Sequence, residues 1–305
     1  MSVDFEYLGL KDEPPRRVEY HQAWGRQRAV HAAVAADEIP GRVLFVEHDA
    51  VYTAGKQTLP EERPFDGTPV VDVDRGGKIT WHGPGQLVGY PIMKLPDRVG
   101  VVDHVRRVEQ AVIELLAHYG IIAGRVPGRT GVWLPADDPD FVPPIEAGPH
   151  HARSVGRTGY FTPGIPEAAA QPDAEARATQ PNPDPRACRG AVPGFQLASI
   201  DGQQDPVGHQ TAVPAADGPR ILRPERKICA IGIRVTKRTT MHGFALNITN
   251  STAGFDNIVP CGIPDAGVTS MAEEMAGPTP SLLEVAERLE PLLATHLSRE
   301  GNLNQ

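Results

Sequence analysis

The sequence has few cysteines, few aromatic residues and no long apolar run. Its 305 residues include only three cysteines, Cys188, Cys229 and Cys261, and 6% aromatic residues. Three scattered cysteines exclude a disulfide framework and a paired-cysteine zinc site. No run approaches the roughly 18 apolar residues that a membrane span needs, and the mixed, acidic N-terminus lacks the pattern of a signal peptide. We therefore expect a reduced, cytoplasmic protein without a metal site.

Basic residues are outnumbered by acidic ones. The chain has 30 Lys and Arg against 38 Asp and Glu, which gives a formal net charge of −8. A nucleic-acid-binding domain usually has a basic footprint, and electrostatic anchoring to anionic lipid needs a basic patch. The charge balance therefore argues against both nucleic acid and membrane as partners.

Proline is abundant, and it is concentrated in one part of the chain. Residues 135–224 hold 16 of the 31 prolines and few large aliphatic side chains. Proline cannot donate a backbone hydrogen bond, and too little apolar surface is present to offset the entropy of ordering. We predict that residues 136–222 are a mostly disordered insertion and that residues 1–135 and 223–305 form a single domain. The insertion has 6 basic and 11 acidic residues, so its charge is −5. A docking or regulatory arm is the alternative to a tolerated insertion.

The rest of the chain mixes helix and strand patterns without strict alternation, which favours an α+β fold. We expect a helix over 18–35, a second one capped by Asp103 and ended by Gly120, and a last one that begins with the capping box Ser281–Glu284 and is interrupted by Pro291. The predicted strands are 43–46, 70–73, 88–93, 130–134, 228–236 and 244–249. The insertion then falls between two strands in a hairpin loop, where added length costs little closure entropy.

The segment Arg75–Gln86 has the highest density of glycine and polar residues. Its four glycines allow close approach of backbone to a ligand, and Arg75, Thr80, His82 and Gln86 supply polar groups. It matches neither a P-loop nor a dinucleotide-binding fingerprint. Taken alone, it predicts either a ligand-binding loop or a glycine-rich turn between strands.

Cys261 lies between Pro260 and Gly262, and Lys227 begins a predicted strand. A free thiol is only slightly ionised at neutral pH unless a nearby cation lowers its pKa. The residues alone leave open whether Cys261 is a nucleophile or a small buried hydrophobe, and whether Lys227 is catalytic or solvated. The residues also leave open whether His48 and His242 are hydrogen-bond donors or turn residues. Cys229 is predicted to lie in the core.

Together these motifs resemble the bacterial octanoyltransferases of lipoate synthesis. The resemblance covers about residues 5–134 and 225–296, and it is carried in order by Arg75–Gly77, Thr80–Gln86, Lys227–Arg234, His242–Asn247, Pro260–Gly262 and Val268–Ser270. It implies the catalytic domain shared with biotin and lipoate protein ligases, a mixed sheet packed with helices. The implied activity moves an octanoyl group from octanoyl-acyl carrier protein to a lysine of lipoyl domains through a cysteine thioester, without a cofactor. The implied acceptors are the 2-oxoacid dehydrogenase complexes and the glycine cleavage H protein.

The resemblance also implies roles by position. Cys261 is the implied nucleophile, and Lys227 lowers the pKa of that thiol and relays protons. The implied substrate-binding residues lie in three segments: Arg75, Gly76, Gly77, Lys78, Ile79, Thr80, Trp81 and His82; Ala230, Ile231 and Gly232; Gly243, Phe244 and Ala245.

The sequence departs from the family pattern in two places. The linker before the Lys227 strand has about 90 residues where the family has a few, and Cys229 stands where the family has a small residue. We predict that Cys229 is not the nucleophile.

Two functions are alternatives to octanoyl transfer. They are an ATP-dependent lipoate or biotin ligase of the same fold and a non-catalytic module that binds a lipoyl domain or an acyl carrier. Any patch that docks the carrier must be local, and the candidates are Arg106, Arg107, Arg125 and Arg129.

Overall fold

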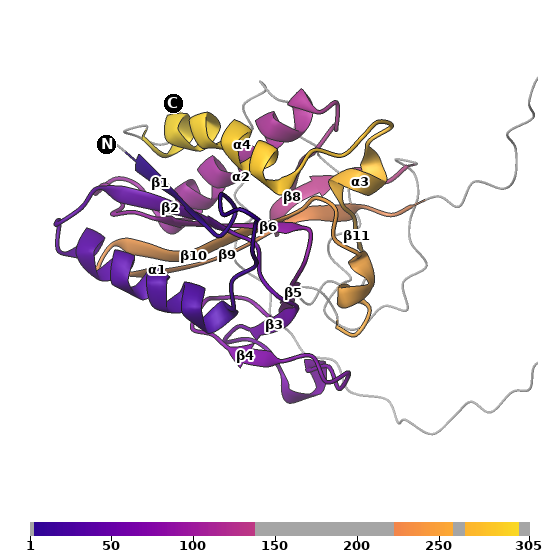
Figure 1. Ribbon diagram of the computed structural model, residues 1–305, viewed down its shortest axis with the longest axis horizontal. Coiled ribbons are helices and arrows are strands. Elements are labelled where there is room, and N and C mark those ends of the chain that lie inside the picture. The colour runs from indigo at the N-terminus through magenta and orange to yellow at the C-terminus, as the bar shows by residue number, and fades with distance from the viewer. Residues whose placement is uncertain (1–2, 138–222, 259–265, 299–305) are drawn as a thin grey trace, which may run out of the picture. The chain divides into compact units, whose positions relative to one another are not determined.

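The computed structural model describes residues 3–137, 223–258 and 266–298, which all belong to one compact unit (Figure 1). The predicted insertion 136–222, apart from its first two residues, lies outside the described residues, as do Cys188 and Cys261.

A mixed sheet forms the centre of this unit. Eight strands build it in the described part of the chain, and β11 (Gly267–Val268) pairs with β9 off the main path. The main order is β1 (Val3–Leu8), β2 (Gly41–Val46), β6 (Gln86–Ile92), β10 (Thr239–Asn247), β9 (Arg226–Thr236), β8 (Arg129–Leu134) and β7 (Gly124–Val126). The pairs β1–β2 and β9–β11 are parallel and the other neighbours are antiparallel. The predicted mixed α+β sheet is confirmed.

A second, smaller sheet carries the glycine-rich segment. It consists of β4 (Val70–Asp72), β3 (Val51–Ala54) and β5 (Thr80–His82), in the order β4–β3–β5. The predicted strand over 70–73 is confirmed as β4. The loop from β4 to β5 contains Arg75, Gly76 and Gly77, and β5 ends at His82.

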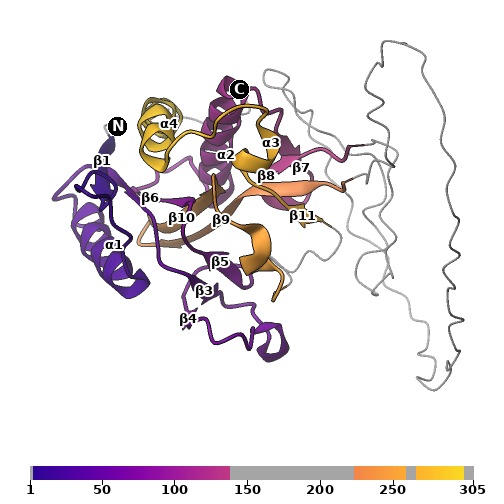
Figure 2. The same ribbon diagram turned by 45° about the vertical axis from the view of Figure 1, so that its right-hand side comes forward.

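Helices cover both faces of the main sheet (Figures 1 and 2). On one face α1 (Tyr20–Ala35) packs on β2, β6 and β10, and on the other α2 (Val101–His118) packs beside α4 (Leu282–Leu297). Short helices are α3 (Met271–Glu274), η1 (Pro60–Glu62) and η2 (Thr252–Phe255). Among the helices described, none is both long and apolar enough to cross a membrane.

Strand β2 shows why the sequence of a buried strand is a continuous run of apolar residues. Val43 and Phe45 join the core under α2 and α4, whereas Leu44 and Val46 join the core under α1. Successive side chains point to opposite faces of a strand, so a strand covered on both faces is apolar throughout.

Most predicted elements are confirmed, with corrections at their ends. Helix α2 begins at Val101 with Gly100 as its N-cap, so the prediction that Asp103 is the N-cap is wrong. Asp103 acts from the third helical position instead, where its Oδ2 accepts from Gly100 N at 2.9 Å. The capping box of Ser281 and Glu284 is confirmed. Pro291 does not end α4, which continues to Leu297.

The predicted hairpin around the insertion is confirmed by strand pairing. Strands β8 and β9 are antiparallel, and Trp133 is the register partner of Lys227. Just beyond these strands, Asp137 N donates to Arg223 O at 3.0 Å. The described chain therefore leaves and re-enters at adjacent points, which keeps β8 and β9 paired.

A glycine pair in the centre of the sheet should be intolerant of a side chain. A Cβ on Gly243 would lie 2.0 Å from Gly89 O, which is backbone and cannot move aside. We expect Gly243→Ala to lower the free energy of unfolding by about 1–3 kcal/mol, as overpacking usually does. The matched control is Gly25→Ala in α1, where a Cβ meets nothing within 4 Å and where alanine should stabilise the helix by about 0.5–1 kcal/mol. Urea unfolding measures both variants, and equal stability of Gly243→Ala and the parent protein would contradict this packing.

Candidate active site

Arg75 folds back onto its own loop and fixes it. Its Nη1 donates to the carbonyl oxygens of Gly76 and Lys78 at 3.0 and 2.8 Å, and its Nη2 donates to Thr53 O at 2.8 Å. The loop also lies close to Gly55, where a Cβ would come within 2.3 Å of the carbonyl oxygen of Gly77. Glycine at these positions lets two backbone segments meet around one guanidinium, which holds the loop in place.

Ile79 and the three residues of β5 divide between two environments. Thr80 and His82 line a cavity, whereas Ile79 and Trp81 pack in an apolar cluster with Tyr52 and Phe255. Alternation along a strand requires this division. Of the eight predicted binding residues in 75–82, the structure therefore places Arg75, Thr80 and His82 at this cavity and two others in the cluster beside it.

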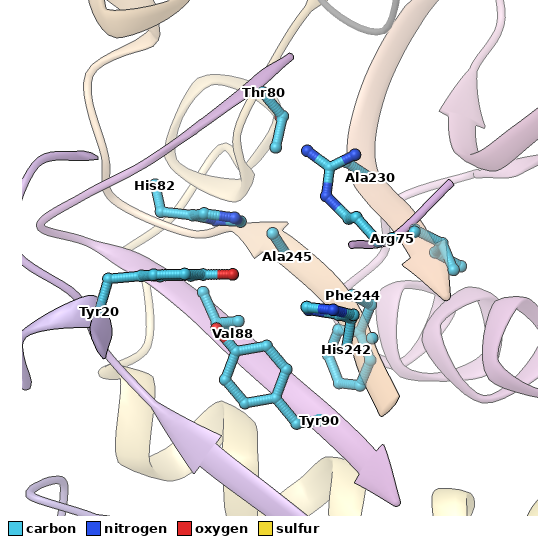
Figure 3. Close-up of a pocket in the computed structure, with 13 residues that line it drawn as sticks. Tyr20, Arg75, Thr80, His82, Val88, Tyr90, Ala230, His242, Phe244 and Ala245 are labelled. Carbon is cyan, nitrogen blue, oxygen red and sulfur yellow. The ribbon is translucent and has the colours of Figure 1, made fainter. Parts of the chain in front are cut away.

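The cavity brings together residues that are far apart in the sequence (Figure 3). It contains all the predicted binding residues of β9 and β10, together with residues from β6 and from the start of α1. Its lining consists of Tyr20, Arg75, Thr80, His82, Val88, Tyr90, Ala230, Ile231, Gly232, His242, Gly243, Phe244 and Ala245. Tyr20, Val88 and Tyr90 are the lining residues that the sequence did not indicate. They meet the others only through strand pairing and the packing of α1.

Two buried histidines in the wall of the cavity region are neutral. His48 Nδ1 donates to Val18 O at 2.7 Å, because a carbonyl only accepts, and His48 Nε2 accepts from the hydroxyl of Tyr90 at 2.7 Å. Burial lowers the pKa of His48 to about 4 and that of His82 to about 3. The centroids of the His82 and Tyr20 rings are 6.2 Å apart, and Figure 3 shows the two rings stacked. Flat, uncharged rings thus form this wall at neutral pH, which suits an apolar ligand.

The neutral state of these histidines has a consequence for stability in acid. In the unfolded chain a histidine titrates near 6.5, so each depressed pKa gives stability that is complete above that pH and is lost as the pH falls toward the folded-state value. Between pH 7 and pH 5 we expect each such histidine to contribute a loss of about 2 kcal/mol. Comparing urea unfolding at the two pH values should show that His48→Gln has a smaller drop than the parent protein by about this amount. An equal drop in both proteins would contradict the neutral assignment.

His242 is held in place at another wall of the cavity. Its φ is +62°, an uncommon conformation for a residue with a side chain, and its Nε2 donates to Asp74 Oδ1 at 2.7 Å. Asp74 also pairs with Arg234 of β9. Burial lowers the pKa of His242 despite its carboxylate partner. The sequence left open whether His242 is a hydrogen-bond donor or a turn residue. In the structure it lines the cavity, and its ring donates to Asp74, which in turn pairs with Arg234.

Lys227 is buried, with 7% of its surface exposed. Its Nζ lies 4.5 Å from the centroid of the Trp133 ring, and within the described ranges it makes no hydrogen bond or ion pair. It lines a smaller cavity together with Thr80, Gln86, Ala230, Ala245, Asn247, Phe255 and Val268. Thr80, Ala230 and Ala245 line the larger cavity too. The alternative of a solvated lysine is therefore wrong, and the side chain lies at the smaller cavity, which adjoins the larger one.

Of Cys229 and Cys261, the structure describes only Cys229. Cys229 is fully buried in the core under α2 and α4, and burial raises the pKa of its thiol far above the ordinary value. The prediction that Cys229 is a core residue is confirmed. Cys261 lies outside the described residues, between Ile258 and Ala266. Downstream of it, Val268 is the register partner of Lys227.

A polar chain links the site to the strand beside Lys227. His82 Nδ1 donates to Gln86 Oε1 at 2.8 Å, Gln86 Nε2 donates to Asn247 Oδ1 at 2.9 Å, and Asn247 Nδ2 donates to Thr269 O at 2.9 Å. Thr269 N in turn donates to Lys227 O at 3.0 Å. Side chains from three strands are thus fixed relative to Lys227. Across the described residues, no group of three or more His, Cys, Asp or Glu side chains is placed to bind a metal ion.

Comparison with known proteins gives concordant results. A family model described as lipoyl protein ligase A/B catalytic domain matches residues 19–141 and 200–293. An octanoyltransferase of Cutibacterium acnes is 47% identical over 303 residues, which cover 97% of this chain and 81% of the relative. An octanoyltransferase of Streptomyces coelicolor is 47% identical over 274 residues, or 89% of this chain and 87% of the relative.

Solved structures with this fold include two ligases. A bi-partite lipoate protein ligase, studied with its E2 lipoyl domain, from Thermoplasma acidophilum has a TM-score of 0.51 and 12% identity, over 99% of this chain and 85% of that one. A lipoate-protein ligase A bound with ATP has a TM-score of 0.50 and 13% identity, over 99% and 88%. At such low identity the likeness concerns the fold alone.

Proposed function

Because the chain belongs to the lipoyl protein ligase A/B catalytic domain family and resembles octanoyltransferases over almost its whole length, we propose that it moves an octanoyl group from octanoyl-acyl carrier protein to a lysine of lipoyl domains. We further propose that the octanoyl group passes through a thioester on Cys261. The acceptors are the lipoyl domains of 2-oxoacid dehydrogenase complexes and the glycine cleavage H protein.

The observation that carries the proposal is the environment of Lys227. A buried ammonium group is costly unless something compensates its charge, and the described residues give this one only the face of Trp133. Lys227 lines the smaller cavity, which shares Thr80, Ala230 and Ala245 with the larger one. Such a side chain suits proton transfer to and from a bound reactant better than it suits a structural ion pair.

In the first step the Cys261 thiolate attacks the carbonyl carbon of the donor thioester. A new carbon–sulfur bond forms, the donor thiol leaves, and it takes up the proton that the Cys261 thiol gave to Lys227. The reaction exchanges one thioester for another, so it needs no ATP. Covalent catalysis of this kind divides one transfer into two steps and gives ping-pong kinetics.

In the second step the acceptor lysine attacks the Cys261 thioester as a neutral amine. The carbon–nitrogen bond forms, the carbon–sulfur bond breaks, and Lys227 receives the proton that the amine loses before returning it to the leaving Cys261 sulfur. General acid and base catalysis by a positioned side chain typically gives about 10²–10⁴-fold in rate. Lys227 therefore acts in both half-reactions.

The larger cavity is the proposed site of the octanoyl chain. Val88, Ile231, Ala245 and the neutral rings of His82 and Tyr20 give it apolar walls. Burial of each methylene is worth about 0.8 kcal/mol, so acyl groups with fewer carbons should bind more weakly by that increment. Arg75 also lines this cavity, and its guanidinium donates to the carbonyl oxygens of Thr53, Gly76 and Lys78.

The alternative is an ATP-dependent ligase, since ligases share this fold. The two functions are separated by incubating the protein with a lipoyl domain under two conditions. One contains octanoyl-acyl carrier protein without ATP, and the other contains octanoate with ATP. The proposal predicts an octanoyl mass increment on the lipoyl domain only in the first, and an increment only in the second would refute it.

A further inference from the structure

A second hollow adjoins the proposed acyl site and is lined by positively charged residues. This groove opens between the first turn of α2, the β7–β8 turn, the glycine-rich loop and β9. Its charged lining residues are all cations: Arg75, Lys78, Arg106, Arg129 and Lys227. Among the described residues that form its wall there is no acidic side chain. In a chain with a net charge of −8, a groove whose lining includes five cationic residues and no acidic one favours an anionic ligand.

Three of these cations, Lys78, Arg106 and Arg129, each pair with an acidic residue that does not line the groove. Arg106 Nη1 lies 2.7 Å from Glu109, whose side chain is fully buried, and Arg129 lies 3.5 Å from Glu225. Lys78 pairs with Glu62. These pairs reduce the net charge of the groove but also fix the direction of the cations, and the side chain of Arg106 remains 37% exposed.

The groove continues from the proposed acyl site. Arg75, Ile231 and Gly232 line both the groove and the larger cavity, and Lys227 lines both the groove and the smaller cavity. A ligand with its acyl chain in the cavity and its reactive carbon beside Lys227 would therefore extend into the groove. Two exposed valines, Val101 and Val102 at 44% and 64%, offer apolar contact along the way.

We propose that this groove binds the phosphopantetheine arm of the acyl donor and that Arg106 and Arg129 bind its phosphodiester. The inference rests on the proposed function. An acyl thioester on such an arm is a linear group that ends in an anion, and this order matches the acyl cavity, Lys227 and the cationic groove in turn. Arginine binds phosphate by charge-assisted hydrogen bonds, often in bidentate geometry.

The same geometry distinguishes among the four arginines that the sequence offered for docking. Arg107 is buried in the core of the molecule. Arg125 donates to Glu109 at 2.9 Å and to the carbonyl oxygen of Arg106 at 2.9 Å. It therefore stabilises the residues of the groove wall without lining the groove itself. Only Arg106 and Arg129 belong to the lining of the groove.

The test compares two small donors, octanoyl-4′-phosphopantetheine and octanoyl-pantetheine, which differ only in the phosphate. We expect kcat/KM in the parent protein to be about tenfold or more higher for the phosphorylated donor, because a charge-assisted contact is lost with the phosphate. In Arg106→Glu and in Arg129→Gln this preference should fall below about threefold, and added salt should reduce it in the parent protein. Arg28→Gln, an exposed arginine of α1, should keep the full preference.

The ratio of the two donors cancels any general loss of activity in a variant. Equal rates for both donors in the parent protein, or a preference unchanged by both groove variants, would overturn the inference and leave the proposed function standing. A KM for the lipoyl domain raised by Arg106→Glu, with the donor preference intact, would assign the groove to the acceptor and also overturn it. If neither donor reacts while octanoate and ATP do, the proposed function itself fails.

Discussion

Replacing Lys227 with Met should reduce octanoyl transfer by about 10²–10⁴-fold, the usual contribution of a positioned acid or base. The reason is that Lys227 lines the smaller cavity, which adjoins the proposed acyl site, and that its Nζ has no hydrogen-bond partner within the described ranges. Met keeps an unbranched side chain of similar length, and its thioether makes favourable contact with an aromatic ring such as that of Trp133. The fold should therefore persist. Steady-state kinetics with octanoyl-acyl carrier protein measure the loss, and unfolding in urea checks the fold.

Two further variants separate chemistry from charge. Lys227→Arg retains a cation but cannot accept a proton, since a guanidinium stays protonated. It should be nearly as inactive as Lys227→Met if Lys227 relays protons. Lys94→Met removes a lysine that pairs with exposed Asp37 and should change activity less than about twofold. Near-normal activity of Lys227→Arg would show that only the charge matters, and near-normal activity of Lys227→Met would remove Lys227 from the mechanism.

Replacing Cys261 with Ser should abolish transfer, with a loss of about 10³-fold or more, because the nucleophile of a covalent mechanism cannot be bypassed. Cys229→Ser is the matched control. Its thiol is buried in the core, and burial raises its pKa far above the range in which it could ionise. Cys229→Ser should retain activity within about threefold and lose stability, since a hydroxyl replaces a buried thiol.

The opposite pattern would contradict the assignment. If Cys229→Ser were inactive and well folded while Cys261→Ser retained transfer, the nucleophile would be Cys229. If both variants were active, the reaction would not pass through a cysteine thioester. Circular dichroism of each variant separates loss of chemistry from loss of folding.

Local patterns predicted much of the secondary structure. The apolar run Val43–Val46 is typical of a strand covered on both faces, and it is β2. The capping box at Ser281 depends only on neighbouring residues and is present. Strand β1 was not among the predicted strands, although Val3, Phe5 and Tyr7 alternate there with acidic residues. Errors arise where one side chain can act at two positions, as with Asp103, whose carboxylate caps α2 from the third residue and not from the N-cap.

The candidate site was predictable in its motifs but not in its assembly. The glycine-rich loop, β9 and β10 each had a visible pattern, and the structure brings Thr80, Ala230 and Ala245 into one place. Tyr90 and Trp133 had no such pattern, because their roles follow from register. Trp133 meets Lys227 only because β8 and β9 pair antiparallel across an intervening segment of 85 residues that the structure does not describe. Burial of Lys227 has the same origin and outweighed the ordinary preference of lysine for solvent.

In the proposed mechanism Cys261 carries the octanoyl group between donor and acceptor. A decisive experiment measures the intact mass of the protein after mixing with octanoyl-acyl carrier protein in the absence of ATP, with Cys261→Ser treated in parallel. The thioester mechanism predicts one octanoyl increment on the parent protein, mapped to Cys261 after proteolysis, absent from the variant and discharged on adding a lipoyl domain. A parent protein that gains no increment while the lipoyl domain is still octanoylated would contradict it.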